Sequence, residues 1–418
     1  MQSKIVVAPE PLELMRRLEA AGEECWVVGD CVRDSLRGVQ PADWDMTTSA
    51  TPERMLQIFE GEHLVTAGLR HGTVGVVRQG RVYEITTYRV ESGTLDHRHP
   101  DHLFFTKDVR DDLARRDFTV NAMAYHPQRG LLDCFGGEQD LRRGIIRCVG
   151  QPALRFTEDA LRILRALRFV AALGFSLEEQ TALAAQQKAE LLQNISAERI
   201  WSELQKLLEA PFAPKALSIC PAVWRQLFPE LQWGREVFLK YLPSDASLRL
   251  IWLYCQQEQN PQPAFLRLRT SRQEQQRAAA LWALWQRKPK SAVQLRYALR
   301  DFGLQRVKEY RLLCDIDPAE WQRAKQSCWE LRQLSIGGQQ LIELGCPKGK
   351  AVGELLGQLL SLCIEGKLEN TSCALQLEAR RRIKAQFPEG YEEMDGTDVF
   401  DLTGCADAGA GNRRGAIL

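Results

Sequence analysis

Within residues 1–145 the pattern of apolar and polar positions alternates between the periods of strands and helices. It predicts three early elements, which are a helix over residues 12–21, a short buried strand from Cys25 to Val28, and a short helix from Val32 to Leu36 that ends near Gly38. It also predicts two strands, Thr73–Val77 and Arg81–Tyr88, joined at Gln79-Gly80. The N-terminal third is therefore expected to mix helices and strands.

From about residue 152 onward the pattern is helical almost throughout. Leu, Ala, Gln, Glu and Arg dominate there, while Val, Ile and Thr become scarce. Candidate boundaries between helical parts are Gly150-Gln151-Pro152, Ala210–Pro214 and Gly337-Gly338.

Two segments show neither the helical nor the strand pattern of apolar positions. Residues 91–107 are polar and rich in His, Arg and Asp, which predicts a mobile loop. Residues 385–404 hold six acidic and no basic residues, and Ala406–Leu418 is rich in Gly and Ala. We therefore expect residues 391–418 to be a disordered tail.

The composition excludes several classes of protein. A chain of 418 residues with 55 basic and 54 acidic side chains is long enough for two to four domains, and its overall charge predicts no partner. The 12 cysteines form no Cys-x-x-Cys pair, which argues against a zinc site and favours a cytoplasmic location. We expect no membrane span, and all six histidines precede residue 127.

Asp43 and Asp45 are the first candidate for chemistry. On a strand, carboxylates at i and i+2 would project from one face about 6–7 Å apart, which suits a pair of divalent cations. The alternative is a solvated turn or a pair of helix caps. Just upstream, Gly29 precedes a predicted helix whose first amides could bind a phosphate.

Three further groups of residues have a functional and a structural interpretation. Glu84 is either a third carboxylate near the aspartates or an edge-strand residue that faces water. Arg115 and Arg116 could bind phosphates bidentately, or the run could begin a helix with Asp117 as its N-cap. Residues 263–311 carry 12 basic and three acidic side chains, which form either an RNA-binding surface or a solvated helical face.

A helix predicted from Glu158 to Ala171 has one apolar stripe, formed by Ala160, Ile163, Leu164, Leu167, Val170 and Ala171. The opposite face carries Glu158, Asp159, Arg162, Arg165 and Arg168. One turn apart, Asp159 and Arg162 could present an acceptor and a donor to the Watson–Crick edge of a base. The alternative is a surface helix with intrahelical ion pairs.

In this order the motifs resemble the class II tRNA nucleotidyltransferases, the CCA-adding enzymes that share a head with bacterial poly(A) polymerases. The resemblance covers residues 20–205 and rests on Val-Gly-x-x-Val-Arg-Asp at 28–34, Asp-Trp-Asp at 43–45, Arg-Arg-Asp-Phe-Thr-Val-Asn-Ala at 115–122, Asp-Cys-Phe-Gly-Gly at 133–137, Glu-Asp-Ala-Leu-Arg at 158–162 and Ile-Ser-Ala-Glu-Arg-Ile at 195–200. A weaker match covers residues 337–370, whereas residues 206–334 match only in being helical.

The resemblance implies an α/β polymerase-β-like nucleotidyltransferase head followed by all-α neck, body and tail domains. We expect the head over residues 1–145, the neck over 146–210, the body over 211–334 and a tRNA-binding tail over 335–390. It also implies that C, C and A are added to the 3′ end of tRNA from CTP and ATP without a nucleic-acid template, with release of pyrophosphate. The sequence specifies no oligomeric state.

The resemblance also implies roles for single residues. Asp43 and Asp45 would bind two Mg²⁺ ions, and Glu84 would be a third catalytic carboxylate. Nucleotide would be bound by Gly29, Asp30, Arg33 and Arg116, and by the template pair Asp159 and Arg162 with support from Arg165 and Arg168. Residues 91–107 resemble the family's flexible loop, which is associated with the switch from C to A addition.

One residue departs from the family pattern. The family has two glycines where this chain has Gly29-Asp30. The side chain of Asp30 adds negative charge beside the nucleotide phosphates and could cap the following helix, which predicts weakened nucleotide affinity.

Three other functions fit parts of the sequence. A bacterial poly(A) polymerase shares the chemistry, although Asn121-Ala122-Met123-Ala124-Tyr125 and Cys346-Pro347-Lys348-Gly349 look more like the CCA-adding branch. A partial CC- or A-adding enzyme also fits, but the loop at 91–107 argues against the CC-only type. A catalytically weakened tRNA-binding protein, with Asp30 as the mark of its decay, is disfavoured by the residues that are retained, which are Asp43, Asp45, Arg33, Asp159 and Arg162.

Overall fold

The computed structural model describes residues 5–92, 102–234, 239 and 242–387. The chain divides into two compact units, Met1–Ala278 and Ala279–Leu418. The division falls within helix α14 (Arg272–Arg287) and inside the predicted body domain, so the four-part division stays a prediction. The predicted fold class is confirmed, because an α/β N-terminal part precedes a helical remainder.

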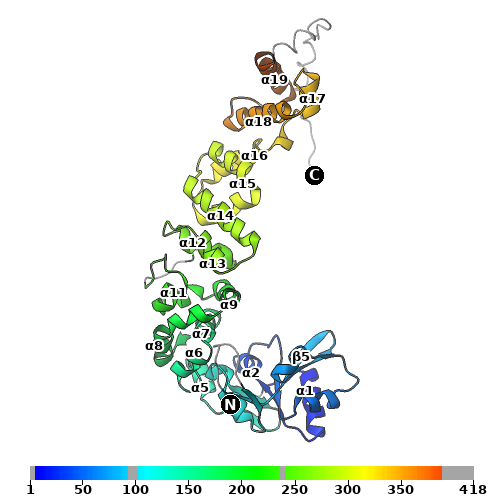
Figure 1. Cartoon of the computed structure of the whole chain (residues 1–418), viewed down its shortest axis with the longest axis vertical. Coiled ribbons are helices and arrows are strands. Elements are labelled where there is room, and N and C mark those ends of the chain that lie inside the picture. The colour runs from blue at the N-terminus through cyan, green and yellow to red at the C-terminus, as the bar shows by residue number, and fades with distance from the viewer. Residues whose placement is uncertain (1–4, 93–101, 235–238, 240–241, 388–418) are drawn as a thin grey trace, which may run out of the picture. The chain divides into compact units, whose positions relative to one another are not determined.

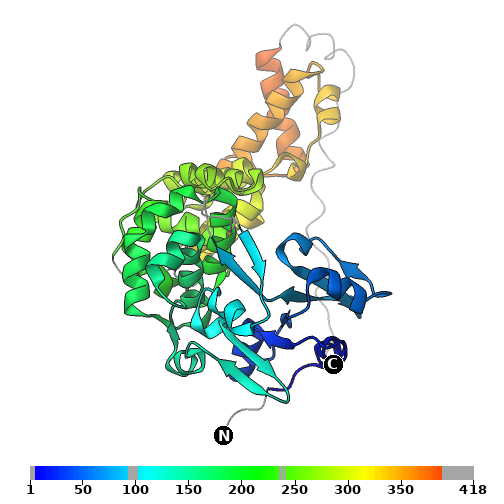
Figure 2. The same ribbon diagram turned by 60° about the horizontal axis from the view of Figure 1, so that its bottom comes forward.

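A seven-stranded mixed sheet forms the core of the N-terminal part (Figures 1 and 2). In spatial order the strands are β3 (Leu64–Val65), β4 (Thr73–Arg78), β5 (Arg81–Thr87), β2 (Met46–Thr48), β1 (Cys25–Val28), β8 (Met123–His126) and β9 (Gly130–Asp133). Neighbours are antiparallel except β2 and β5, which are parallel. All four residues of β1 are buried, as expected for a strand covered on both faces.

The predicted strands Cys25–Val28, Thr73–Val77 and Arg81–Tyr88 are confirmed within one residue at each end. The connection between β4 and β5 has positive φ at both central residues, 50° at Gln79 and 76° at Gly80. This backbone matches the right-handed twist of a two-residue hairpin, which explains why the Gln-Gly pair was a reliable signal.

Helices precede, connect and follow the strands of the sheet in chain order: α1 (Pro9–Ala20) before β1, then α2 (Asp30–Leu36), α3 (Pro52–Ile58) and α4 (Val109–Ala114) between strands, and α5 (Gly137–Arg143) after β9. The 3-10 turns are η1 (Leu69–His71) and η2 (Thr119–Asn121). Helix α4 is anchored by Val109 and Leu113, which pack in one buried cluster with Trp26, Val28 and Tyr88. This packing fixes the C-terminal end of α4 close to the middle of the sheet.

The prediction of a loop over residues 91–107 is wrong at its edges. Strand β6 (Arg89–Ser92) pairs antiparallel with β7 (His102–Phe105), with Val90 opposite Phe104. The aromatic and β-branched side chains at these positions favour pairing despite the polar residues beside them. Residues 93–101 and the predicted tail at 391–418 lie outside the described residues.

The rest of the first unit is helical and also contains the two-stranded parallel pair β10 (Ile145–Ile146) and β11 (Ser176–Leu177). Its elements are α6 (Pro152–Glu158), α7 (Leu161–Leu173), α8 (Glu179–Gln187), η3 (Ala189–Asn194), α9 (Ala197–Glu209), α10 (Ala213–Leu217), α11 (Pro221–Leu227), α12 (Ala246–Cys255) and α13 (Gln262–Arg267). Helix α7 packs against both α9 and α10.

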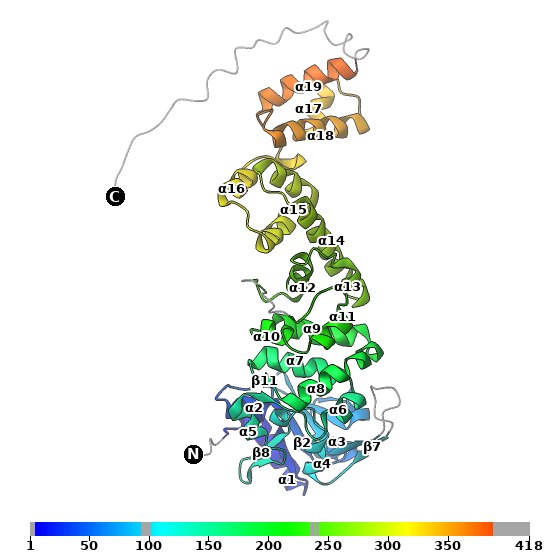
Figure 3. The same ribbon diagram turned by 90° about the vertical axis from the view of Figure 1, so that its left-hand side faces the viewer.

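The second unit consists of the end of α14 followed by α15 (Ala292–Leu313), α16 (Pro318–Gln326), η4 (Leu331–Gln333), α17 (Gly338–Glu343), α18 (Lys350–Glu365) and α19 (Ser372–Gln386). Figure 3 shows α17, α18 and α19 side by side. Their buried cluster includes Leu341, Leu359 and Leu375. In the described part of the chain, no helix combines the length and apolar character that a membrane crossing requires.

Helix α5 begins at a pair of glycines with different constraints. Gly136 has φ of 76° and nothing within 4 Å of where a Cβ would stand. Gly137 would place a Cβ 2.1 Å from the carbonyl oxygen of Thr119. The Asp133 carboxylate accepts from the backbone amide of Gly137 at 2.9 Å, so this glycine is held against η2.

Gly137→Ala is expected to destabilise the protein more than Gly136→Ala, although only Gly136 has positive φ. The first substitution forces backbone of η2 to move, at a cost of about 3 kcal/mol or more. The second adds left-handed strain of about 1–2 kcal/mol. Urea unfolding of both variants measures the difference, and equal losses would contradict the close approach.

Candidate active site

Asp43 and Asp45 lie in the segment that leads into β2, which begins at Met46. They are therefore just ahead of the strand on which they were predicted. Asp45 still continues the sheet, because its carbonyl oxygen accepts from the Val28 amide at 2.9 Å. The end of β1 and the start of β2 thus bring Asp45 beside Gly29.

Glu84 lies in the strand next to these aspartates. Strands β2 and β5 are parallel with Met46 opposite Ile85, so Glu84 is beside Asp45 in the register. The Glu84 side chain is exposed. The structure therefore confirms that β5 neighbours the segment with Asp45, and contact of Glu84 with a metal stays a prediction.

Negative charge accumulates around Asp45. Burial and the carboxylate of Asp30 raise the pKa of Asp45 to about 6, Glu84 and Asp43 add to the rise, and Arg116 opposes it. A nearby cation would stabilise the charged form of an aspartate in this environment.

The donor set fits Mg²⁺ held jointly by protein and substrate. Among the described residues, no three His, Cys, Asp or Glu side chains converge closely enough to hold an ion alone. Mg²⁺ is commonly bound by one or two carboxylates together with substrate phosphates, and this arrangement needs only Asp43 and Asp45 from the protein.

The backbone conformation at the mouth of the site requires glycine at position 29. Its φ is 84°, and a Cβ would lie 3.1 Å from Nη1 of Arg116. Gly29 is itself the N-cap of α2, without a capping side chain, and Asp30 is the first residue of the helix. The prediction that Asp30 could cap α2 is therefore wrong, because the chain has already entered the helix at that residue.

Arg33 is held rigidly under the site and is only 7% exposed. Its Nη1 donates to Oδ1 of Asn121 at 2.8 Å, and its Nε and Nη2 donate to the two oxygens of Asp34 at 2.9 and 2.8 Å. The guanidinium group lies 5.6 Å from the ring centroid of Phe169 on α7. Such bracing lowers the entropy that an anion-binding arginine loses when it binds.

Arg116 extends from the end of α4 across Gly29. Its Nη2 lies 3.4 Å from Oδ2 of the buried Asp112. Within the described residues its Nε is buried and has no hydrogen-bond partner. A buried guanidinium nitrogen without an acceptor is the environment that an oxyanion would complete.

A cleft of about 510 Å³ joins these groups. Its lining includes Gly29, Asp30, Arg33, Asp45, Arg116, Asp117, Asn121, Arg165, Arg168, Phe169 and Lys206. We call it the first cleft. It brings Asp45 and the predicted phosphate-binding arginines into one space.

The helix predicted from Glu158 to Ala171 is interrupted. Helix α6 ends at Glu158, and α7 begins at Leu161. Asp159 lies in the junction with extended backbone, and its Oδ1 accepts from the Leu161 amide at 3.0 Å. The break arises because an Asp side chain competes for backbone amides, which favours a helix start over a helix interior. The apolar stripe itself is confirmed as buried.

In this structure both members of the predicted template pair have protein partners. Oδ2 of Asp159 accepts from Nη2 of Arg199 on α9 at 2.9 Å. Arg162 donates to Oε2 of Glu158 at 2.7 Å and to the carbonyl oxygen of Arg115 at 3.3 Å.

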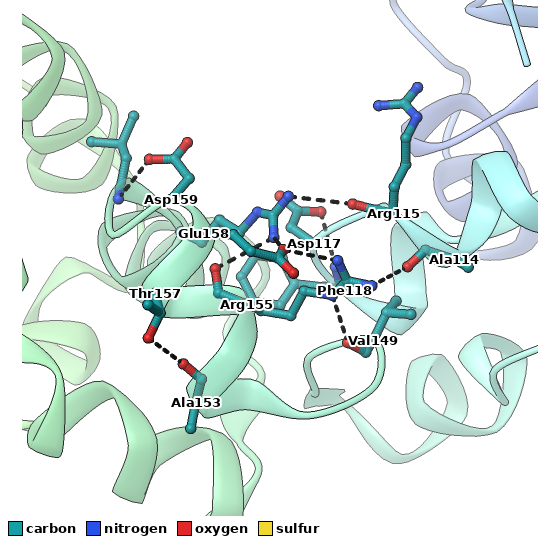
Figure 4. A network of polar contacts seen from close by, with 12 residues as sticks. Ala114, Arg115, Asp117, Phe118, Val149, Ala153, Arg155, Thr157, Glu158 and Asp159 are labelled. Atoms are coloured by element: carbon teal, nitrogen blue, oxygen red, sulfur yellow. Dashed lines mark hydrogen bonds and ion pairs between the residues drawn. The ribbon is translucent and has the colours of Figure 1, made fainter. Parts of the chain in front are cut away.

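Figure 4 shows the network around this junction. Arg155 of α6 donates to the carbonyl oxygens of Val149 and Ala114 and to Glu158. It therefore ties α6 to the end of α4.

Arg165 and Arg168 lie on the next turns of α7, paired with acids that the sequence analysis did not select. Arg165 Nε donates to Oδ2 of Asp117 at 2.8 Å, so Asp117 is an ion partner and not a helix N-cap. Arg168 Nε lies 3.1 Å from the buried Glu203 of α9. Burial lowers the pKa of Arg168, although Glu203 opposes this effect.

A second cleft of about 410 Å³ shares Arg116, Asp117 and Arg165 with the first. Its other lining residues are Arg89, Arg115, Asp159, Leu161, Arg162 and Arg199. The site residues predicted from the sequence therefore gather along two adjoining clefts, except Asp43 and Glu84, which line neither cleft.

The basic run at 263–311 is not shown to form one RNA-binding surface, because it crosses the boundary between the two units. Several of its arginines have acidic partners, such as Arg267 with Glu230, Arg277 with Asp245 and Arg287 with Asp301. Its role in RNA binding stays a prediction.

Four supporting residues were not predicted from the sequence: Asp112, Asn121, Arg199 and Glu203. Asp112 had a local signal, because it precedes Arg115 and Arg116 by three and four residues on a helix. The pairings of Arg33 with Asn121, of Asp159 with Arg199 and of Arg168 with Glu203 join distant segments, so their spacing carries no signal.

Comparisons with known proteins agree with this arrangement. Residues 25–147 match the family described as "Poly A polymerase head domain". Residues 174–232 match "Probable RNA and SrmB- binding site of polymerase A".

Curated relatives match nearly the whole chain. A CCA-adding enzyme of Geobacillus stearothermophilus is 33% identical over 86% of this chain and 94% of the relative. A CCA-adding enzyme of Limosilactobacillus fermentum is 34% identical over 91% of this chain and 100% of the relative.

Solved structures of CCA-adding enzymes are also similar to this chain. The Bacillus stearothermophilus CCA-adding enzyme in complex with CTP is 30% identical, with a TM-score of 0.71 over 91% of this chain and 99% of that chain. The Thermotoga maritima CCA-adding enzyme, 23% identical with a TM-score of 0.65, shares the fold over 90% of this chain and 96% of that chain. On identity and coverage together, the chain belongs to the family of CCA-adding enzymes.

Proposed function

We propose that this chain adds C, C and A to the 3′ end of tRNA from CTP and ATP, and releases pyrophosphate. The first cleft is the observation that carries the proposal. It combines carboxylates around Asp45 with the arginines Arg33, Arg116 and Arg168. Such an arrangement can neutralise a triphosphate while cations are held beside its reacting phosphate.

Asp43 and Asp45 would hold two Mg²⁺ ions. Bound there, the ions would supply activation of the tRNA 3′-hydroxyl towards the nucleotide α-phosphate and charge neutralisation for the departing pyrophosphate. The elevated pKa of Asp45, caused by burial and neighbouring carboxylates, supports cation binding at this point.

Arg116 and Arg33 would hold the triphosphate or the sugar. The buried Nε of Arg116 has no acceptor among the described residues, so a phosphate oxygen would complete its coordination. Arg33 is braced by Asp34 and Asn121, which fixes its guanidinium plane before the nucleotide arrives.

Asp159 and Arg162 would select the base in the second cleft, with Arg165 and Arg168 supporting them. A carboxylate accepts from the exocyclic amine that cytosine and adenine share, and a guanidinium donates to ring or carbonyl acceptors. The contacts of Asp159 with Arg199 and of Arg162 with Glu158 would have to be exchanged for base contacts.

The related Bacillus stearothermophilus enzyme was solved in complex with CTP, which supports CTP as a substrate of this chain. We place the reaction in the cytoplasm, where tRNA and nucleoside triphosphates are available. A poly(A) polymerase or a partial CC- or A-adding enzyme would use the same two clefts, and the products of the assay below distinguish them.

Asp43→Asn and Asp45→Asn are each expected to lower kcat by about a thousandfold, because a neutral amide binds Mg²⁺ poorly and transition-state charge is left unneutralised. The assay supplies tRNA without its 3′ end, together with CTP, ATP and Mg²⁺. Addition of three nucleotides by the unmodified protein supports CCA addition.

Asp111→Asn is the matched control, because Asp111 is an exposed aspartate that lines neither cleft. It is expected to keep full activity. A long A tract would indicate a poly(A) polymerase, and no extension would indicate a binding protein. Full activity of Asp45→Asn would contradict the proposed role of the pair.

Asp30→Gly is expected to lower the KM for CTP and ATP by about fivefold, because one negative charge next to the triphosphate is removed. Asp30→Asn keeps the size of the side chain without its charge and should give most of the same gain. Steady-state kinetics at saturating tRNA measure both variants. An unchanged KM in both would show that Asp30 does not weaken nucleotide binding.

A further inference from the structure

Asp112 of α4 is a fully buried carboxylate, with 0% exposure, whose arginine partners line the clefts. Its Oδ1 accepts from Nε and Nη2 of Arg115 at 2.9 and 2.8 Å. Its Oδ2 lies 3.3 Å from the Thr47 hydroxyl and 3.4 Å from Nη2 of Arg116. Both oxygens of this carboxylate are therefore in use.

The two oxygens serve different parts of the site. Oδ1 orients Arg115, which lines the second cleft and whose carbonyl oxygen accepts from Arg162. Oδ2 orients Arg116, which lines both clefts. The Asp112 carboxylate thus orients Arg115, in the cleft where the base is proposed to bind, and Arg116, which also lines the cleft where the triphosphate is proposed to bind.

Thr47 connects the same carboxylate to the predicted metal-binding segment. It is fully buried in β2, two residues after Asp45. Its hydroxyl is 3.1 Å from the Thr86 carbonyl oxygen of β5 and 3.3 Å from Asp112. Strand β2 and the end of α4 are therefore held together beneath the site.

The electrostatics agree with a charged carboxylate. Burial acts to raise the pKa of Asp112, but Arg115 and Arg116 outweigh it and hold the pKa below its usual range. A buried carboxylate with several charge-assisted hydrogen bonds has little freedom to move. Asp112 lines neither cleft, so any effect on the reaction passes through its partners.

We propose that Asp112 is a positioning residue for nucleotide binding, which holds Arg115 and Arg116 in register with the strand that follows Asp43 and Asp45. The inference rests on the proposed function, because it requires a nucleoside triphosphate in the first cleft. It assigns Asp112 a role in affinity for the phosphates that CTP and ATP share, and no role in discriminating between their bases.

Asp112→Asn is expected to raise the KM for CTP and for ATP in parallel by about tenfold, because Arg116 loses its charged partner. The dissociation constant for tRNA should change less than about twofold, since Asp112 is buried. Thr47→Val removes one hydroxyl and should raise both KM values by about threefold. It also provides a milder variant if Asp112→Asn folds poorly.

A thermodynamic cycle separates positioning from general stability. In an Arg116→Gln background, Asp112→Asn should raise KM by less than about twofold, because the Asp112 partner that lines the first cleft has already been removed. Asp111→Asn, the exposed neighbour on the same helix, serves as control and should leave KM and the melting temperature unchanged.

Equilibrium dialysis with CTP distinguishes a failure of the proposed function from a failure of the positioning role of Asp112. If the unmodified protein does not bind CTP, the proposed function fails and the inference with it. If it binds CTP and folded Asp112→Asn binds equally well, the positioning role is overturned while the proposed function stands. Additive effects of Asp112→Asn and Arg116→Gln on KM would also overturn it.

Discussion

The site depends on negative charge that the strand register concentrates around Asp45. Strands β1 and β5 flank the entry into β2, so Asp45 is close to Asp30, Asp43 and Glu84. Arg116 offsets part of this charge. Like charges that lie close together are unfavourable without cations, so the fold supplies a binding potential for metal ions.

The positive charge of the site comes from arginines whose orientation is fixed by acidic side chains. Arginines along the clefts are paired with acids: Arg33 with Asp34, Arg115 with Asp112, Arg165 with Asp117, Arg168 with Glu203 and Arg162 with Glu158. Paired and partly buried guanidinium groups keep their orientation before a ligand binds, which favours preorganised electrostatic stabilisation over flexible steering. Two of these pairs join α7 to other segments, Arg168 to Glu203 of α9 and Arg165 to Asp117, which follows α4, so stability and function depend on shared contacts.

Local signals in the sequence predicted part of this arrangement. The strand Cys25–Val28 and the Gln79-Gly80 hairpin follow from apolar runs and turn chemistry, and the buried stripe of α7 follows from its period. The break at Asp159 was missed because helical periodicity continues across it. Long-range pairings, such as Arg33 with Asn121, depend on tertiary contacts that single-chain spacing cannot encode.

The central claim is that Asp43 and Asp45 bind the metal ions that act on a nucleotide held in the first cleft. A crystal structure of the chain with CTP and Mn²⁺, recorded with anomalous scattering, tests it most directly. We expect anomalous peaks at metal ions bonded to both aspartates and a triphosphate oxygen in contact with Arg116. Metal bound elsewhere, or CTP outside the first cleft, would contradict it.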